Sequence, residues 1–368
     1  MTFETSLLTN FKIFSILLNQ YALWRKQKMK ILGIDTSCDD TSVAIVENGN
    51  NVLSSVLSSS IDAHKEFQGV VPEIAARKHL EAILYVIDKA LKDAKTTLDD
   101  IDLFAVTNRP GLLGSLLVGV GSAKALAFSL NKPLLALDHI AAHIYSPHLT
   151  NNIEFPYIAL VVSGGHTIIT EVHDYGEYKV VGTTLDDAVG EAYDKVSKFL
   201  NLGYPGGPII DKLAREGDKE AIKYPIVLLN GVDEFNFSYS GLKTACVYST
   251  QKYLQKGYEP TNENIAAAFQ ISAIEPLYIK TLKYVEKSGI KKVTLSGGVA
   301  CNSYLRERFG NSKDFECYLP ALKYTTDNAA MVAGLAYYMK DKEEFADYAL
   351  DCSSRVLNKK YNKNKSIK

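Results

Sequence analysis

The sequence contains few cysteines, and no two of them are close enough to form a metal-binding pair. Its 368 residues include five, at Cys38, Cys246, Cys301, Cys317 and Cys352. An odd number of widely spaced cysteines without a CxxC pair excludes a disulfide framework and a thiolate zinc site. We therefore expect reduced thiols and a cytoplasmic protein.

Positive charge is not in excess either. Lys and Arg number 41 and Asp and Glu number 42, so the net charge is −1. This excludes a protein that binds nucleic acid through overall basicity, and leaves only a local basic patch or a basic partner to hold a polyanion. Hydrophobic residues at 46% and charged residues at 23% are ordinary for a globular chain and exclude a wholly disordered one.

Long apolar runs are missing as well. The uncharged stretch from Ile13 to Trp24 has 12 residues, whereas a membrane-spanning helix needs about 20. A signal peptide would carry positive charge before this run, but Glu4 stands there. We expect no membrane association and interpret residues 1–28 as an extension that is disordered or non-native, with an amphipathic docking helix as the alternative.

From residue 30 the chain alternates between strand and helix patterns. The predicted strands are 31–35, 42–47, 52–58, 103–107, 134–137, 157–162, 167–173, 292–295 and 317–319. The predicted helices are 72–94, 114–130, 190–200, 209–216, 264–288 and 328–339, with Pro276 expected to kink or divide the fifth. Two strand–turn–strand openings, each followed by this alternation, predict two related α/β lobes with a cleft between them.

The segment after the strand 134–137 carries two histidines four residues apart. His139 and His143 would share one face of a helix that Asp138 can cap, so both rings could reach one metal ion. The zinc-protease motif of the same spacing needs Glu directly after the first His, but Ile140 stands there, which argues against a peptidase. Two polar helix residues without a ligand are the alternative.

Paired glycines follow two of the predicted buried strands. They lie in Ser163-Gly164-Gly165-His166 and Ser296-Gly297-Gly298. Gly-Gly at a strand end lets a ligand approach the backbone, whose N–H groups can hold phosphate oxygens. Two such turns fit a nucleotide held from two sides, and the polar turn 36–41 would be a third phosphate-facing loop. Ordinary turns are the alternative.

Two aspartates stand beside predicted helix starts. Asp211 follows the YPGGP loop at 204–208, where its charge would stabilise the first turn of a helix. Asp327 precedes the helix 328–339 and is either a cap or the carboxylate of a two-His, one-carboxylate metal site. The spacing leaves both readings open.

Taken together, these motifs resemble the TsaD (Gcp) family of tRNA threonylcarbamoyladenosine synthases. The matching segments cover residues 30–355 in order: GIDTSCDDT at 33–41, GVVPE at 69–73, PGL at 110–112, the two histidines, VSGGH at 162–166, GEAYDK at 190–195, YPGGP at 204–208, FSYSGLKT at 237–244, SGG at 296–298 and TDNAAM at 326–331.

The resemblance implies an α/β, actin-like (ASKHA, sugar-kinase type) fold with two lobes and a central cleft. Lobe I would span 29–137 and be joined by a C-terminal helix at about 328–350. Lobe II would span 138–327 and carry the metal and nucleotide loops. Residues 354–368, rich in Lys and Asn, are expected to form a frayed tail.

The resemblance also implies an activity. The enzyme would transfer threonylcarbamoyl from threonylcarbamoyl-adenylate to N6 of the adenosine beside the anticodon, in tRNAs that read codons starting with A. One divalent ion, iron(II) or zinc, would be held by His139, His143 and Asp327. The donor, or ATP or another adenine nucleotide, would contact Val161, Val162, Ser163, Gly164, Gly165, Asp194, Gly207, Asp211 and Asn302.

Partners are implied too. They are tRNA, the actin-like paralogue TsaB, the ATPase TsaE, and TsaC, which makes the donor, while a homodimer is possible when the protein is alone. An actin-fold ATPase or kinase and a non-catalytic scaffold are the competing functions. Kinases of this fold use carboxylates with magnesium and need no histidine pair, so His139 and His143 favour the acyltransferase.

The sequence departs from the family at two loops. The family commonly reads ETSCDET where this chain has Asp35 and Asp40, and AGPG where it has Asn108-Arg109-Pro110-Gly111. Asp39 and Asp40 are the candidate catalytic carboxylates, although an Asp is one methylene shorter than Glu and reaches less far. Arg109 is expected to be exposed to solvent, or else to contact phosphate or a partner.

Overall fold

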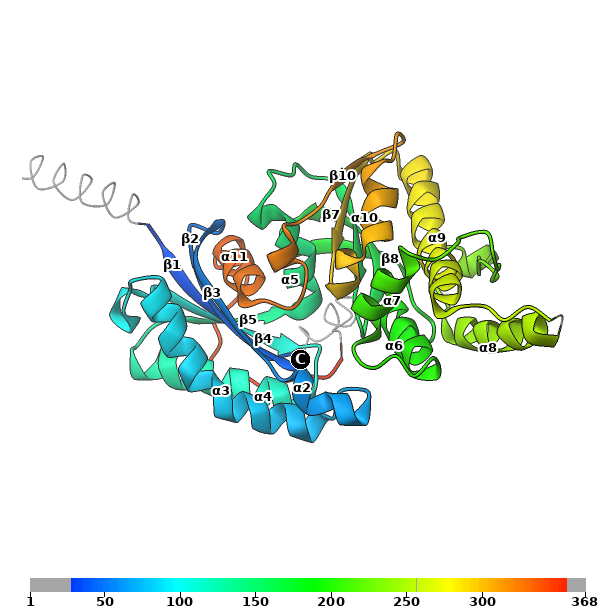
Figure 1. The fold of residues 1–368 in the computed structure, drawn as a ribbon. Helices are drawn as coiled ribbons and strands as arrows, with labels where there is room; N and C mark the ends of the chain where they lie inside the picture. Colours follow the sequence, from blue (N-terminus) through cyan, green and yellow to red (C-terminus); the bar gives the residue numbers. More distant parts are fainter. Residues whose placement is uncertain (1–27, 256, 356–368) are drawn as a thin grey trace, which may run out of the picture.

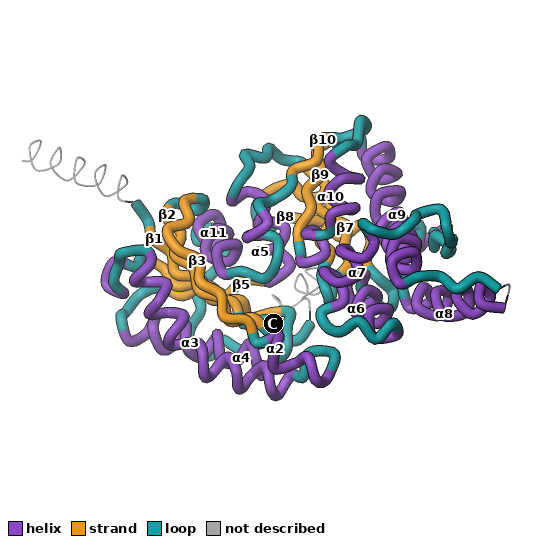
Figure 2. The backbone as a smooth tube through the Cα atoms, in the orientation of Figure 1, coloured by secondary structure: helices purple, strands orange, loops and turns teal. Residues whose placement is uncertain are grey.

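The computed structural model describes residues 28–255 and 257–355. The predictions for residues 1–27 and for 356–368 therefore lie outside the described residues. Two five-stranded sheets, each covered by helices, form two halves of the molecule (Figures 1 and 2). Within the described ranges no helix has the length and apolar character needed to cross a bilayer.

The first sheet has the strand order β3-β2-β1-β4-β5. Its strands are β1 (Lys30–Asp35), β2 (Asp40–Glu47), β3 (Asn51–Ser59), β4 (Leu103–Arg109) and β5 (Leu134–Asp138). The first three strands are antiparallel, and β4 and β5 run parallel to β1. Asn48 and Gly49 adopt positive φ in the β2–β3 turn, as the Asn-Gly pattern predicts.

Alternate residues of this sheet face two different layers. Leu32 and Ile34 pack with α3 (Pro72–Asp93) and α4 (Leu113–Ser129). Ile31 faces the other way and packs with α11 (Ala329–Met339). The last helix of the described residues, α11, therefore covers the first sheet. This supports the proposal that lobe I comprises 29–137 with the C-terminal helix and that lobe II comprises 138–327.

The second sheet repeats the order of the first as β8-β7-β6-β9-β10. Its strands are β6 (Tyr157–Val162), β7 (Thr167–Asp174), β8 (Glu177–Thr183), β9 (Lys292–Ser296) and β10 (Glu316–Tyr318). Two antiparallel pairings are again followed by two parallel ones. One face packs against α6 (Val189–Phe199), α7 (Gly206–Ala214), α8 (Ser240–Gln255), α9 (Asn262–Ser288) and α10 (Ser303–Gly310).

Several elements differ from the expectation. The edge strand β8, the helix α8 and the short helix α2 (Ile61–His64) were not expected from the sequence pattern. Helix α9 continues through Pro276, so the expected division does not occur. Ala273, Pro276 and Leu277 are all buried in this helix, so tertiary packing stabilises it where proline cannot donate a backbone hydrogen bond.

Candidate functional site

Helix α5 (His139–Tyr145) lies between the two sheets and presents three faces. Ala142 and Tyr145 pack with the first sheet and α11. Ile140 and Ile144 pack with β6 and β7 of the second sheet. Residues four apart share a face, so the remaining face carries both histidines into the space where the two halves meet.

The helix begins as the sequence predicts. Asp138 is its N-cap, and the Asp138 carboxylate accepts hydrogen bonds from the backbone N–H of Ile140 at 2.9 Å and of Ala141 at 3.2 Å. The cap fixes the first turn and with it the direction of the His139 side chain.

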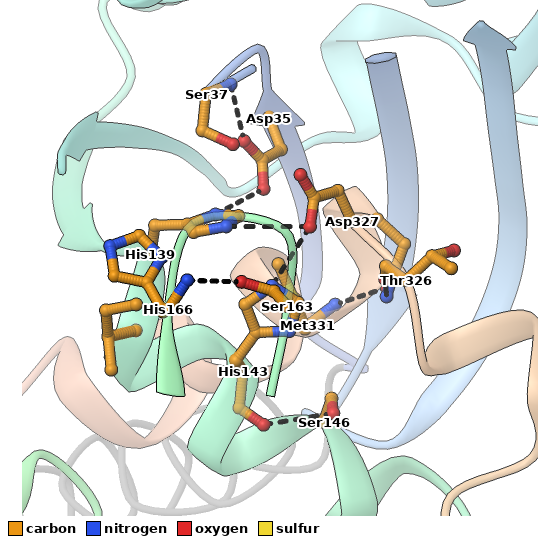
Figure 3. Close-up of polar contacts among 12 residues, drawn as sticks. Asp35, Ser37, His139, His143, Ser146, Ser163, His166, Thr326, Asp327 and Met331 are labelled. Carbon is orange, nitrogen blue, oxygen red and sulfur yellow. Dashed lines mark hydrogen bonds and ion pairs between the residues drawn. The ribbon is translucent and has the colours of Figure 1, made fainter. Parts of the chain in front are cut away.

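Asp327 completes a group of three potential metal ligands (Figure 3). Its Oδ1 lies 3.0 Å from His143 Nε2 and 3.6 Å from His139 Nε2. One ligand atom from each of the three residues lies within 4.8 Å of the others. The cap of α11 is Asn328, whose side-chain oxygen accepts from Met331 N–H at 3.0 Å. Asp327 is thus the carboxylate beside the histidines and does not cap the helix.

Asp35 contacts the ring nitrogen of His139 that faces away from Asp327. Its Oδ2 lies 3.1 Å from His139 Nδ1, and its Oδ1 accepts from Ser37 N–H at 2.9 Å. A carboxylate can only accept here, so Nδ1 carries a proton, and Nε2 is the ring nitrogen that faces Asp327. The sequence pattern marks Asp35 as a departure from the family but does not predict this contact.

The charges of the cluster stabilise one another. Burial lowers the pKa of His139, but the carboxylates of Asp35 and Asp327 outweigh burial and raise this pKa to about 9. Burial raises the pKa of Asp327, and the two histidines overcome that effect and lower it below its usual range. His143 Nδ1 is buried without a hydrogen-bond partner. Two imidazole nitrogens and one carboxylate oxygen form a donor set that fits zinc or iron(II).

A pocket of about 680 Å³ opens beside this cluster. It lies between the β1–β2 loop, the β6–β7 loop, α6 and the loop before α11. Its lining includes Ser37, Cys38, Asp39, Asp40, His139, Ser163, Gly164, Gly165, His166, Glu191, Asp194, Lys195, Lys198, Tyr204, Gly298, Thr326, Asp327 and Ser354. Residues from both halves of the molecule therefore meet around one space.

The two glycine turns have different local geometries. Ser163 and His166 close the first turn, with Ser163 N–H donating to His166 O at 2.8 Å, and a side chain at Gly164 or Gly165 would meet no atom within 4 Å. Gly297 has φ of 88°, and a Cβ there would collide with the backbone of Val162. The first turn leaves room for a ligand at its tip, and the second needs glycine for its own close packing.

The other predicted donor contacts are spread over the second half of the molecule. Asp194 lines the pocket. Val161 and Val162 are fully buried within β6. Gly207 lies at the start of α7 with open space at its Cβ position, and Asn302 caps α10 by accepting from Leu305 N–H at 3.0 Å.

Asp211 is not at the start of its helix as expected. Because α7 begins at Gly206, Asp211 lies in the second turn. Its Oδ1 accepts from Ser303 N–H at 3.1 Å and Ser303 Oγ at 2.7 Å, while Oδ2 pairs with Arg215 at 2.7 Å. It joins α7 to the start of α10 and, like Gly207 and Asn302, is not part of the lining of the 680 Å³ pocket in the described chain.

The two candidate catalytic carboxylates line the pocket. Burial raises the pKa of Asp39, and burial together with the nearby carboxylates raises the pKa of Asp40 to about 7. Asp40 Oδ1 is a buried atom without a hydrogen-bond partner. Burial also raises the pKa of Cys38 well above its usual value, so this thiol is not activated as a nucleophile.

Arg109 is not simply exposed to solvent. Its side chain is 26% exposed, and Nε lies 3.6 Å from Oδ2 of Asp138, the cap of α5. The guanidinium also donates to Asn108 Oδ1 at 3.3 Å. The cation of the unusual NRPG loop therefore faces the helix that carries both histidines.

Comparison with known proteins identifies clear relatives. Residues 51–334 match the family model described as TsaD: tRNA N6-adenosine threonylcarbamoyltransferase. A tRNA N6-adenosine threonylcarbamoyltransferase of Brachyspira hyodysenteriae is 93% identical over 92% of this chain and its own full length. One of Treponema denticola is 49% identical over 89% of this chain and 97% of its own length.

Solved structures share the fold at low sequence identity. Full-length HypF in its phosphate- and nucleotide-bound form aligns over 86% of this chain and 56% of its own, with a TM-score of 0.57 and 15% identity. Component A of the (R)-2-hydroxyglutaryl-CoA dehydratase of Acidaminococcus fermentans aligns over 85% of this chain and all of its own, with a TM-score of 0.51 and 16% identity. These neighbours place the molecule in the actin-like ASKHA fold, as expected.

Proposed function

The chain belongs to the TsaD family of tRNA N6-adenosine threonylcarbamoyltransferases, and we propose that the pocket beside His139, His143 and Asp327 performs this transfer. The donor would be threonylcarbamoyl-adenylate, and the acceptor N6 of the adenosine beside the anticodon in tRNAs that read codons starting with A. ATP or another adenine nucleotide would compete for the donor site. The observation that carries the proposal is the three-residue ligand group, two members of which, His139 and Asp327, line a pocket built from both halves.

We propose that His139, His143 and Asp327 hold one divalent ion, iron(II) or zinc. Such an ion would supply a Lewis acid for the donor's carbonyl group. Asp35 keeps the proton of His139 on Nδ1 and so orients Nε2 as a ligand. The donor set supports the assignment because both residue types bind these two metals.

The donor is already an activated mixed anhydride, so the enzyme needs no covalent nucleophile. Its tasks are to place the donor carbonyl against N6 and to exclude water from the reacting atoms. Ser163, Gly164 and Gly165 are proposed to contact the donor, because their turn lines the pocket and leaves its tip free. Val161, Val162, Asp194, Gly207, Asp211 and Asn302 are proposed to complete or support the nucleotide site.

Asp40 is proposed as the proton acceptor for N6. It lines the pocket, one of its oxygens is unpartnered, and its pKa of about 7 suits a general base at neutral pH. Burial raises the pKa of Asp39 as well. The Asp39 carboxylate is proposed to raise the pKa of Asp40 further through the repulsion of its neighbouring charge.

The partners proposed for this chain are tRNA, TsaB, TsaE and the donor-producing TsaC. A face of α3 and α4 supports docking of an actin-like paralogue such as TsaB, because large apolar side chains there are exposed. They are Leu80, Leu84 and Tyr85 on α3 and Leu113 and Leu117 on α4. The two helices are close neighbours, since a Cβ at Gly114 would lie 3.2 Å from Ala76 Cβ.

Transfer of labelled threonine to an unmodified tRNA that reads an ANN codon tests the proposal. The reaction contains this protein, TsaB, TsaE, TsaC, ATP and bicarbonate, and a tRNA without the target adenosine is the control. Label in the first tRNA alone is expected. Absence of label, with the same partners active beside a relative of this chain, would overturn the proposed function.

A further inference from the structure

Two buried histidines outside the metal cluster contact the loop that carries Asp39 and Asp40. His64 ends the short helix α2 and His79 lies in α3, and both side chains are fully buried. Neither is part of the lining of the 680 Å³ pocket in the described chain. A buried imidazole is costly unless its ring nitrogens are hydrogen-bonded, so the partners of these rings indicate what the two residues do.

His79 contacts the loop through both ring nitrogens. Its Nε2 lies 3.0 Å from the backbone oxygen of Cys38, and its Nδ1 lies 2.7 Å from Thr41 Oγ1. A carbonyl oxygen can only accept, so Nε2 carries the proton, and in the neutral ring Nδ1 accepts from the Thr41 hydroxyl. Burial lowers the pKa of His79 and so favours this neutral ring. One side chain of α3 therefore holds the loop on both sides of the two candidate carboxylates.

His64 acts on the same loop through Ser60. The backbone N–H of Val71 donates to His64 Nδ1 at 3.3 Å, so in the neutral ring the proton lies on Nε2, 3.2 Å from Ser60 Oγ. The Ser60 hydroxyl donates to the backbone oxygen of Asp39 at 2.6 Å, and Ser60 N–H donates to the same oxygen at 3.2 Å. His64 thus orients the hydroxyl that holds the Asp39 carbonyl.

These contacts hold the peptide groups that precede the two carboxylates. The carbonyl of Cys38 belongs to the peptide that leads into Asp39, and the carbonyl of Asp39 belongs to the peptide that leads into Asp40. Because a peptide is planar, holding its oxygen restricts the direction in which the next side chain leaves the backbone. Asp40 Oδ1 is buried and has no hydrogen-bond partner within the described residues, so its place in the pocket depends on this backbone.

We propose that His79 and His64 are positioning residues, which hold the loop 38–41 so that the Asp40 carboxylate can reach N6 of the acceptor adenosine. The inference rests on the proposed function and deepens it, because it names the side chains that place the proton acceptor. Both histidines act through the loop, so their loss should slow the chemical step more than it weakens the binding of substrate or metal.

Steady-state transfer by the full assembly, with tRNA varied, tests the proposal. Thr41→Val removes the hydroxyl that donates to His79. His79→Leu removes both contacts of the ring, whereas His79→Gln is the conservative variant, since a glutamine amide N–H can take the place of Nε2 and donate to Cys38 O. Bound metal and the free energy of unfolding are measured for each variant.

Two control variants remove the same side chains at buried positions elsewhere. Thr170→Val removes a hydroxyl that donates to Ala159 O at 3.3 Å within the second sheet. His148→Leu removes a ring whose Nε2 lies 3.1 Å from the Tyr157 hydroxyl. Neither Thr170 nor His148 lines the pocket in the described chain, so both controls should keep the kcat of the unaltered protein.

We expect His79→Leu to lower kcat about 10- to 100-fold, because a small displacement of a reacting group costs a rate of that order. Thr41→Val should lower kcat roughly 2- to 10-fold, the equivalent of one hydrogen bond. His79→Gln should recover part of the rate that His79→Leu loses. The KM for tRNA and the bound metal should stay as in the unaltered protein.

Ser60→Ala tests the contribution of His64, because it removes the hydroxyl between His64 and Asp39 O. Ser272→Ala is its matched control, since the Ser272 hydroxyl is also buried and donates to a backbone oxygen, that of Tyr224, at 3.1 Å. The kcat should fall roughly 2- to 10-fold in the first variant and stay unchanged in the second. Equal rates in both would remove His64 from the proposal.

A kcat in Thr41→Val and His79→Leu as high as in their controls would overturn the inference. So would equal losses in variants and controls, or a His79→Leu rate that falls only in proportion to its bound metal, since each result would assign His79 a structural role alone. If His79→Leu does not fold, Thr41→Val and His79→Gln decide by the same criteria. Transfer of label by the unaltered protein is the separate test of the proposed function.

Discussion

At the residue scale, the site depends on how a buried carboxylate directs an imidazole. Asp35 is only 1% exposed, and its two oxygens are divided between the backbone of Ser37 and Nδ1 of His139. In a histidine that binds a metal, the group hydrogen-bonded to the second ring nitrogen fixes the tautomer and the direction of the ring. An Asp where the family commonly has Glu therefore still makes this contact in the present chain.

Replacing Asp35 by Asn should weaken metal binding about 10- to 100-fold, because the amide cannot accept from Nδ1 with a full negative charge. Competition against a chelator of known affinity measures the change. Asp102→Asn is the matched control, since Asp102 accepts from Lys30 N–H at the other end of β1. Equal metal affinity in Asp35→Asn and the unaltered protein would exclude the orienting role.

Asp40 should make stability depend on pH. Its pKa is raised by burial to about 7, so between pH 4 and 7 the folded state binds more protons than the unfolded one. The free energy of unfolding should then fall as pH rises through this range, by at most about 4 kcal/mol from Asp40, and should level above pH 7. Urea unfolding at pH 5 and pH 8 measures it.

In Asp40→Asn most of the fall in the free energy of unfolding between pH 4 and pH 7 should disappear. If the carboxylate accepts the N6 proton, kcat should also drop about 10²- to 10⁴-fold. The exposed Asp62→Asn variant serves as the control for the general effect of removing a charge. A pH dependence of stability identical in both variants would show that Asp40 ionises as an ordinary surface carboxylate.

Sequence alone predicts the histidines better than it predicts their surroundings. The spacing of His139 and His143 places them on one face, and that local rule holds in α5. Whether Asp327 caps a helix or faces the histidines depends on a contact across more than 180 residues, which spacing cannot supply. The contact between Asp35 and His139 also joins distant parts of the chain, 104 residues apart, and was not predicted.

At the scale of single elements, α5 is a short helix between two cores. Its seven residues serve the first sheet, the second sheet and the pocket on separate faces. The sequence predicts its start through Asp138 and places it in lobe II, but it does not predict that the helix packs against both sheets. Strand β8 escaped prediction for a related reason, since it is an edge strand with mostly exposed side chains.

The exposed apolar face of α3 and α4 gives a prediction at this scale. Leu84→Glu should weaken association with TsaB at least about thirtyfold, equivalent to about 2 kcal/mol, because a charge would be buried in the interface. The free energy of unfolding of the Leu84→Glu variant alone should change by less than about 0.5 kcal/mol, since Leu84 is 76% exposed. Sedimentation of the mixed proteins measures the association, and urea unfolding of the variant alone measures its stability.

Val232→Glu provides the matched control, because Val232 is fully accessible in the short turn 231–233 and belongs to the other half of the molecule. Association that is weakened equally by both changes, or by neither, would remove the α3–α4 face as the docking surface.

At the scale of the whole molecule, two sheets with the same strand order frame one pocket. The strand patterns predict this repetition because each half starts with a hairpin, and the order β3-β2-β1-β4-β5 recurs as β8-β7-β6-β9-β10. The volume between the halves could not be predicted, because it depends on how α5 packs against both sheets.

Metal titration of the transfer reaction tests whether the histidine pair and Asp327 hold the ion that the reaction needs. Metal is removed with a chelator, and iron(II) or zinc is added back while bound metal and labelled threonine in tRNA are both measured. Activity should rise with bound metal and stop rising at one ion per chain. His143→Ala should bind no ion and transfer no label, whereas His173→Ala, at an exposed histidine paired with Glu171, should match the unaltered protein. Full transfer without metal, or a His143→Ala variant that keeps both metal and rate, would contradict the proposed site.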